Sequence, residues 1–134
     1  MSRKIYVNIP VKDLKKSVDF FIRLGFEFNP QFTDENATCM IIGDDSFVML
    51  LAEDFFTTFT QKKVSDATTQ TEAILGLSAD SRDGVDDLVD KALAAGGQPS
   101  KEPMDGDGMY SRSFQDLDGH LWEVIYMDPS ALGQ

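Results

Sequence analysis

Cysteine and histidine are almost absent from this chain of 134 residues, which holds one of each, Cys39 and His120. A single cysteine cannot form an internal disulfide, which fits a reducing compartment, so we expect a cytoplasmic protein. A cysteine-type zinc site needs several thiolates, and a Ser-His-Asp triad would have to use His120. Cys39 lies in an apolar run that predicts a buried strand, and we interpret it as structural rather than nucleophilic.

Long apolar runs and basic residues are also scarce. Runs such as residues 47–52 are too short to cross a membrane, and polar residues interrupt the first apolar segment, so we expect no signal peptide. Twelve Lys and Arg against 23 Asp and Glu give a formal net charge of −11. Residues 66–134 have a net charge of −10 and residues 1–65 a net charge of −1. Nucleic acid and anionic membranes are therefore not expected as partners.

The remaining composition, 42% hydrophobic and 10% aromatic, is that of a folded globular chain. Residues 5–11 alternate apolar and polar side chains and predict a strand, which Pro10 places at a sheet edge or ends. Asp13 offers an N-cap to a helix that Gly25 ends. Residues 26–51 hold three further strand candidates, so the first half predicts the order β-α-β-β-β.

The second half predicts the same order. Residues 73–79 are a strand candidate, and a helix follows that Asp83 caps and Gly96 ends. Three more strand candidates close the chain at residues 98–101, 110–115 and 121–127. The acidic segment 105–108 lacks the ligand spacing of an EF-hand and is interpreted as a solvated turn.

The segment between the halves is polar and rich in threonine. Residues 60–72 therefore predict a linker that joins modules 1–59 and 73–134 within one domain, 1–134. Before it, Phe55, Phe56 and Phe59 have the spacing of one helical turn. These rings fit a lid, a dimer contact or the core, and the core is the default interpretation.

Direct comparison of the two halves supports an internal repeat. Residues 44–51 match residues 118–125 at a constant shift of 74 in their acidic, turn and apolar classes. Two such units predict an α+β fold of two βαβββ modules, whose curved, cupped mixed sheets shelter each other's apolar faces. Cupped sheets in a small chain also leave apolar edges to cover, which favours a homodimer.

Three segments, residues 8–17, 24–26 and 116–124, give the chain its resemblance to a known family. In order and spacing they resemble the vicinal oxygen chelate superfamily, which contains glyoxalase I, the bleomycin-resistance proteins and the extradiol dioxygenases. The resemblance is strongest to an uncharacterised bacterial branch of glyoxalase-like proteins. It implies the glyoxalase/bleomycin-resistance/dioxygenase fold, in which each half forms a cup, and it also implies a homodimer.

Metal-dependent members of that family place ligands, often His and Glu, on the first and last strands of both halves. The resemblance assigns these four positions to Tyr6, Met49, Ile74 and Glu123. A tyrosine must lose a proton with a pKa of about 10, a thioether suits Cu(I) better than zinc, nickel or iron, and isoleucine has no donor. We therefore expect no cofactor, with a divalent metal as the alternative, and interpret His120 as a turn residue.

The resemblance and strand alternation together place eight side chains in a ligand cavity. They are Tyr6, Asn8, Met49, Leu51, Ile74, Arg112, Glu123 and Ile125. A carboxylate among apolar side chains has a raised pKa unless it is paired, and Arg112, Asn8 and Tyr6 are candidate partners of Glu123. The alternative for Arg112 is a surface salt bridge. Trp122 alternates with Glu123 and is expected to face a helix.

These observations predict binding of a small organic molecule without a transition metal, as bleomycin-resistance proteins sequester drugs. The alternative is an enzyme, a glyoxalase-like lyase, isomerase or dioxygenase, in which Glu123 is the general base or a residual metal ligand. A third possibility is an interaction protein whose cup is filled by side chains.

Overall fold

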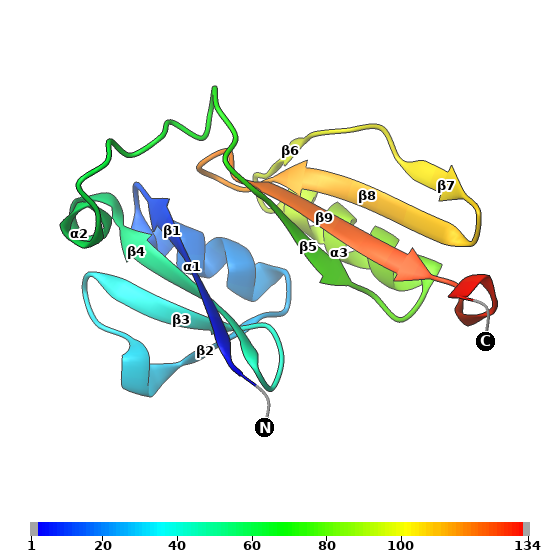
Figure 1. The fold of residues 1–134 in the computed structure, drawn as a ribbon, viewed down its shortest axis with the longest axis horizontal. Coiled ribbons are helices and arrows are strands. Elements are labelled where there is room, and N and C mark those ends of the chain that lie inside the picture. Colours follow the sequence, from blue (N-terminus) through cyan, green and yellow to red (C-terminus); the bar gives the residue numbers. More distant parts are fainter. Residues whose placement is uncertain (1–2, 133–134) are drawn as a thin grey trace. The chain divides into compact units, whose positions relative to one another are not determined.

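The computed structural model describes residues 3–132, and the chain forms two compact units, Met1–Val64 and Ser65–Gln134 (Figure 1). The first unit contains β1 (Ile5–Val11), α1 (Leu14–Arg23), β2 (Glu27–Asn29), η1 (Pro30–Phe32), β3 (Ala37–Ile41), β4 (Ser46–Ala52), α2 (Glu53–Phe56) and η2 (Thr57–Phe59). The second contains β5 (Ile74–Ser78), α3 (Arg82–Ala94), β6 (Gln98–Pro99), β7 (Met104–Gly106), β8 (Met109–Gln115), β9 (Leu121–Met127) and η3 (Pro129–Leu132).

The two units share one order of four strands, to which the second unit adds the short strand β7. The first sheet has the order β1-β4-β3-β2, and the second has β5-β9-β8-β6 with β7 paired to β8. In each, the first strand runs parallel to the last long strand, β1 to β4 and β5 to β9, while the other pairs are antiparallel. The α+β fold of two βαβββ modules is therefore confirmed. Pro10, which lacks an N–H donor, lies on the edge strand β1.

In the first unit, α1 packs on one face of the sheet. The Asp13 side chain caps it by accepting a hydrogen bond from the Lys16 N–H at 3.1 Å, and Gly25 ends it at φ +103°, where L side chains are strained. Phe20 and Phe21 are each 1% exposed in the core beneath this helix. The expected helix boundaries follow from these two ends.

In the second unit, α3 covers the face of the sheet that holds Trp122. The Trp122 ring is fully buried and stacks on Phe114, with ring centroids 6.2 Å apart. The predicted cap of α3 is wrong: Ser81, not Asp83, accepts the hydrogen bond from the Gly84 N–H at 2.9 Å. The extended backbone of Ser81 brings its hydroxyl to that N–H, whereas Asp83 is already in the first helical turn.

Two short elements differ from the predicted ones. The predicted strand 98–101 is reduced to β6. The expected turn at 105–108 is shorter, because Asp107 and Gly108 alone form it, with φ of 55° and 77°. The residues on either side pair as β7 and β8. Two positive φ angles in a two-residue connection are typical of a tight hairpin.

The segment 60–72 is more ordered than a simple linker. Asp66 accepts hydrogen bonds from the Thr68, Thr69 and Gln70 N–H groups. The turn that Asp66 closes lies against Gly119. A Cβ added at Gly119 would come within 2.7 Å of the Ala67 carbonyl oxygen, so this position has room only for glycine. The boundary between the two units falls inside this segment, after Val64.

The default placement of three phenylalanines in the core is wrong for one of them. Phe55 and Phe56 are partly exposed, while Phe59 is 67% exposed. The rings of Phe55 and Phe59 meet edge to face at 5.1 Å, as the helical spacing predicts. Helix α2 follows directly after β4 and is only four residues long. Such a short helix does not supply enough side chains to bury Phe59. No helix among residues 3–132 is long and apolar enough to cross a membrane.

Candidate functional site

Each sheet has one face covered by its long helix, α1 or α3, and we call the opposite face the open face (Figure 1). The register places the four positions suggested by the resemblance at equivalent points. Tyr6 lies opposite Phe47, two residues before Met49 in β4, and Ile74 lies opposite Leu121, two residues before Glu123 in β9. Within each unit the two positions therefore share the open face. A common cavity of all four stays a prediction.

On the first open face, aromatic and apolar side chains surround the Asn8 carboxamide. Tyr6 is 48% exposed and stacks on Phe47 with ring centroids 5.1 Å apart. Asn8 is exposed, lies opposite Met49 and donates a hydrogen bond from Nδ2 to the Tyr6 carbonyl oxygen at 3.3 Å. Its Oδ1 atom therefore remains as an acceptor above the sheet.

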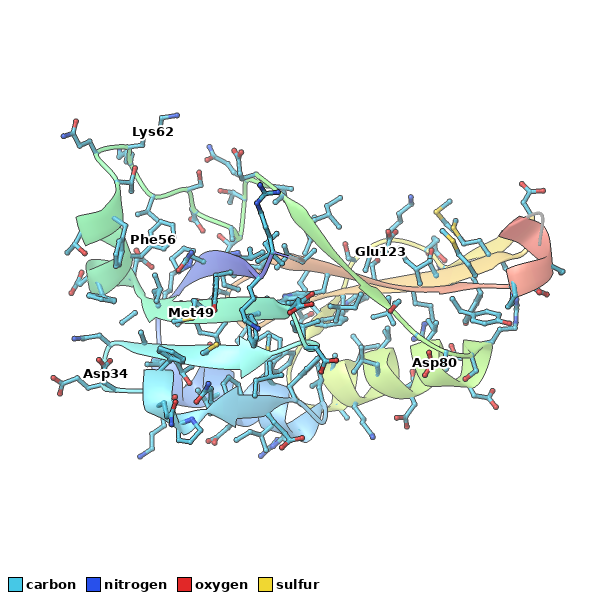
Figure 2. All side chains as sticks on the ribbon, turned by 60° about the horizontal axis from the view of Figure 1, so that its bottom comes forward. Asp34, Met49, Phe56, Lys62, Asp80 and Glu123 are labelled. Carbon is cyan, nitrogen blue, oxygen red and sulfur yellow. The ribbon has the colours of Figure 1, made fainter. Side chains whose placement is uncertain are left out.

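This face also contains a cavity of about 360 Å³, lined by Asn8, Leu51, Phe56, Phe59 and Thr60. Asn8 and Leu51 were both predicted to line a cavity, and the structure brings them together. Phe56 comes from α2, beside the end of β4 (Figure 2). The Thr60 Oγ1 accepts a hydrogen bond from the Lys62 N–H at 3.0 Å, so its own O–H can donate to a ligand.

On the second open face, Glu123 lies on the side of its sheet away from α3 (Figure 2). It is partly exposed and stands between Gly76 of β5 and Ser113 of β8. Ile125 follows on the same face, and Ile74 is 61% exposed. Within the described residues the Glu123 carboxylate makes no hydrogen bond or ion pair, so it is available to a ligand.

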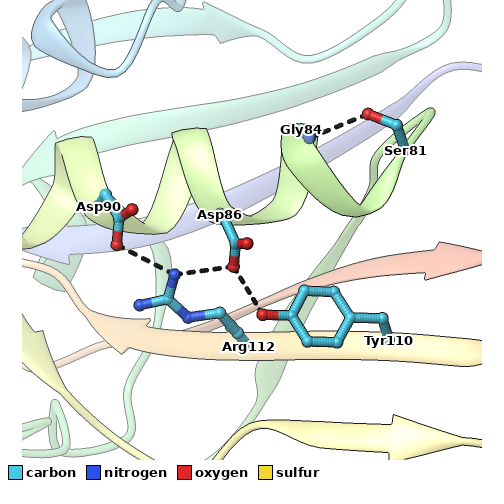
Figure 3. Close-up of polar contacts among 6 residues, drawn as sticks. All are labelled: Ser81, Gly84, Asp86, Asp90, Tyr110 and Arg112. Carbon is cyan, nitrogen blue, oxygen red and sulfur yellow. Dashed lines mark hydrogen bonds and ion pairs between the residues drawn. The ribbon is translucent and has the colours of Figure 1, made fainter.

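The predicted pairing of Arg112 with Glu123 is wrong. Arg112 lies opposite Val124 on the face that α3 covers, whereas Glu123 lies opposite Ser113. The guanidinium instead forms ion pairs with Asp86 and Asp90 of α3, each at 3.0 Å (Figure 3). Because neighbouring residues of a strand point to opposite faces, a side chain aligned with Phe114 and Tyr110 cannot reach Glu123. The alternative of a salt bridge is the one the structure supports.

Arg112 is part of a larger polar network between α3, β7 and β8. The Tyr110 O–H donates to Asp86 at 2.6 Å, and this bond, followed by those from Arg112, lowers the pKa of Asp86 (Figure 3). The Arg82 guanidinium lies 4.4 Å from the centre of the Tyr110 ring and pairs with Asp105 of β7. The network fixes α3 to the sheet and leaves Arg112 no role at the open face.

The buried carboxylate of Asp116 was not predicted from the sequence. Asp116 is 5% exposed and accepts hydrogen bonds from the Asp118 and His120 N–H groups, both at 3.0 Å, and from the Trp122 indole N–H at 2.9 Å. Burial raises the pKa of Asp116. The signal was present in the sequence, because an Asp ahead of an Asp-Gly turn and a tryptophan is typical of a turn-closing acceptor. The role of His120 in a turn agrees with this arrangement.

The donors do not fit the metal that the resemblance implies. Tyr6 and Met49 in the first unit, and Ile74 and Glu123 in the second, supply a single ordinary ligand for a divalent ion. Among residues 3–132 no group of three or more His, Cys, Asp and Glu side chains is arranged to hold a metal. Cys39 is 1% exposed, and burial raises the pKa of its thiol, which disfavours the thiolate.

A second cavity, of about 540 Å³, lies in the second unit at the β7–β8 hairpin. Its lining residues are Met104, Asp105, Gly106, Asp107, Gly108, Met109 and Met127. None of them was predicted to line a cavity, and the strand β7, which brings Met104 beside β8, was not expected from the sequence.

Solved structures of other proteins share this fold over nearly the whole chain. A hypothetical protein SA1046 from S. aureus is 33% identical over 94% of this chain and 95% of its own, with a TM-score of 0.79. A glyoxalase/bleomycin resistance protein/dioxygenase family enzyme from Burkholderia phytofirmans PsJN has a TM-score of 0.77 at 19% identity, covering 94% and 99% of the two chains.

The fosfomycin resistance protein FosX from Listeria monocytogenes has a TM-score of 0.70 at 17% identity, over 98% of this chain and 94% of its own. At such identities these two structures share the fold. The curated proteins contain no match. The family model for the Glyoxalase/Bleomycin resistance protein/Dioxygenase superfamily matches residues 5–124. The resemblance is thus confirmed, and the chain belongs to the glyoxalase/bleomycin resistance protein/dioxygenase superfamily.

Proposed function

We propose that this protein binds a small organic molecule in the cavity on the open face of the first sheet, without a transition metal in that cavity. The observation that carries the proposal is the cavity of about 360 Å³ lined by Asn8, Leu51, Phe56, Phe59 and Thr60. Its size and its mainly apolar walls with few polar groups are typical of small-molecule sites.

The lining also defines the class of ligand. Phe56 and Phe59 offer ring faces and edges, which favour a flat or aromatic body. Asn8 Oδ1 can accept a hydrogen bond from a ligand, and the Thr60 O–H can donate one, since Asn8 Nδ2 and a Thr60 Oγ1 lone pair are already engaged. A compact aromatic molecule with one donor and one acceptor therefore matches this cavity.

A thermal-shift screen of small aromatic compounds, followed by titration calorimetry of the hits, tests this proposal. We expect Phe59→Ala to weaken binding at least tenfold, because it removes one cavity wall. Phe32→Ala is the matched control: Phe32 is 57% exposed in the same unit and does not line the cavity. Absence of any stabilising compound, or equal effects of the two variants, would contradict the proposal.

The second candidate function is enzymatic, and the unpaired Glu123 carboxylate on the second open face favours it. In a glyoxalase-like lyase, isomerase or dioxygenase, Glu123 would act as a general base or as a residual metal ligand. Glu123→Gln separates the candidates. Loss of turnover with unchanged ligand binding supports the enzyme. Stoichiometric divalent metal in protein purified without chelator, lost in Glu123→Gln, supports the role of Glu123 as a residual metal ligand and contradicts binding without a metal as the whole function.

We also propose a second copy of this chain as its protein partner. Ile5 and Tyr6 of the edge strand β1 are 58% and 48% exposed, and exposed apolar side chains on a sheet edge favour association. Sedimentation equilibrium gives the mass of the assembly, and a monomer at micromolar concentration contradicts the proposed homodimer.

We also propose a cytoplasmic location, because the single free Cys39 is typical of a protein from a reducing compartment.

A further inference from the structure

The cavity at the β7–β8 hairpin has an unusual lining, because three of its seven residues are methionines. Met104 comes from β7, Met109 from β8 and Met127 from β9. The chain has six methionines in all, so half of them line this one cavity. The proposed small-molecule cavity belongs to the first unit and uses none of them.

The strand register explains how the three thioethers come together. Met109 lies directly opposite Met127 in the antiparallel pair β8–β9, a position in which Cβ atoms are about 4.5–5.5 Å apart. Met104 lies opposite Ser111, two residues along β8 from Met109, and therefore projects from the same face. Methionine has three rotatable side-chain bonds, so three neighbours on one face can turn their sulfurs toward one point.

We propose that Met104, Met109 and Met127 bind a soft monovalent metal ion, of the class of Cu(I) and Ag(I). Thioether sulfur is a ligand that selects Cu(I) over zinc, magnesium or calcium. Met104 and Met127 are 40% and 48% exposed, so an ion can reach them from solvent. Asp107 lies at the same cavity and favours a cation, whereas Asp105, the strand neighbour of Met104, pairs with Arg82 on the opposite face.

Harder ions do not suit this cavity. Asp105 and Asp107 are its two carboxylates, and it holds no imidazole or thiolate. An apolar small molecule is the other occupant that methionines favour. Metal titration distinguishes the two, because an apolar molecule gives no response to Ag(I).

The test is a titration of the full chain with Ag(I), in chloride-free buffer, followed by native mass spectrometry and calorimetry. The background carries Cys39→Ala, because a thiol would compete for Ag(I). We expect one Ag(I) per chain. Replacing the three methionines together by leucine, which nearly conserves their volume, is expected to weaken binding at least tenfold. Met49→Leu is the matched control, since Met49 lies in the other unit, and it should leave the affinity unchanged.

A second readout uses the Cys39→Ala chain with all its methionines in place. In spectra of ¹³C-labelled methionine methyl groups, the signals of Met104, Met109 and Met127 should move with Ag(I), while that of the fully buried Met40 should stay. Failure of the Cys39→Ala chain to bind Ag(I), or undiminished binding by the triple leucine variant, overturns the proposal. Neither result bears on the small-molecule cavity of the first unit.

Discussion

At the residue scale, the buried Asp116 shows how one side chain organises a turn. One carboxylate oxygen accepts hydrogen bonds from two backbone N–H groups of the turn, and the other accepts a hydrogen bond from the Trp122 indole N–H. Burial raises the pKa of Asp116, so its charged form is disfavoured in the folded chain. Its contribution to stability therefore increases as pH falls through the folded pKa toward the unfolded value, about 3.9.

We predict that Asp116→Asn destabilises the second unit by about 1–3 kcal/mol at pH 7. A carboxamide has one acceptor oxygen, so if that oxygen serves the turn, the amide nitrogen faces the indole N–H and two donors oppose each other. Urea unfolding followed by circular dichroism measures the change. In a Trp122→Phe background the same substitution should cost less, because the opposing donor is gone. Equal costs in both backgrounds would show that the indole contact is not the cause.

At the scale of elements, the contact of α3 with β8 depends on charged groups as well as on the apolar core. Arg112, whose side chain is 19% exposed, holds both Asp86 and Asp90. The hydrogen bond from Tyr110, followed by that from Arg112, lowers the pKa of Asp86. A carboxyl group with a lowered pKa in the folded state contributes stability above its unfolded value, about 3.9, and loses it as pH falls through the folded pKa.

We therefore predict that Asp86→Asn destabilises the chain by about 1 kcal/mol at pH 7, because the site is partly open to solvent. The difference from the unsubstituted chain should narrow as pH falls below about 3.9, because Asp86 takes up its proton there in the unfolded chain but only at lower pH in the folded chain. Urea midpoints at pH 7, 4 and 3 measure it. Asp87→Asn is the matched control, since Asp87 forms its ion pair with Lys91 on the same helix and is 65% exposed. A difference that persists unchanged at pH 3 would contradict the prediction.

At the scale of the whole molecule, the two units differ in charge. Residues 66–134 have a net charge of −10 and residues 1–65 a net charge of −1. Repulsion among like charges destabilises a folded unit and is screened by salt. The second unit should therefore gain more from salt than the first.

We predict that 0.5 M NaCl raises the unfolding midpoint of the second unit by about 2–4 °C, equivalent to roughly 0.5 kcal/mol for a unit of this size. The chain's single tryptophan, Trp122, is buried in the second unit, so its fluorescence reports that unit's unfolding. Amide hydrogen exchange at Phe20 and Phe21 reports the first unit and should respond less. Equal stabilisation of both units would point to a general salt effect instead of charge screening.

The sequence by itself determined the repeated order of elements. Strand alternation, the cap at Asp13 and the glycine at position 25 act through neighbouring residues, and the structure follows them. Alternation also placed Trp122 against α3, and with the resemblance it placed Tyr6 and Met49 on one face. The family was likewise accessible from three short segments.

Only the tertiary structure decided which partners the polar groups have. The sequence left Arg112 open between a pairing with Glu123 and a surface salt bridge, and α3 supplies two carboxylates on the opposite face of the sheet. The same holds for Asp116 beneath the indole and for the methionines around the hairpin. Local patterns set the direction of a side chain relative to its own strand, whereas its contacts depend on which distant element packs there. For this reason the elements were predictable and the contacts were not.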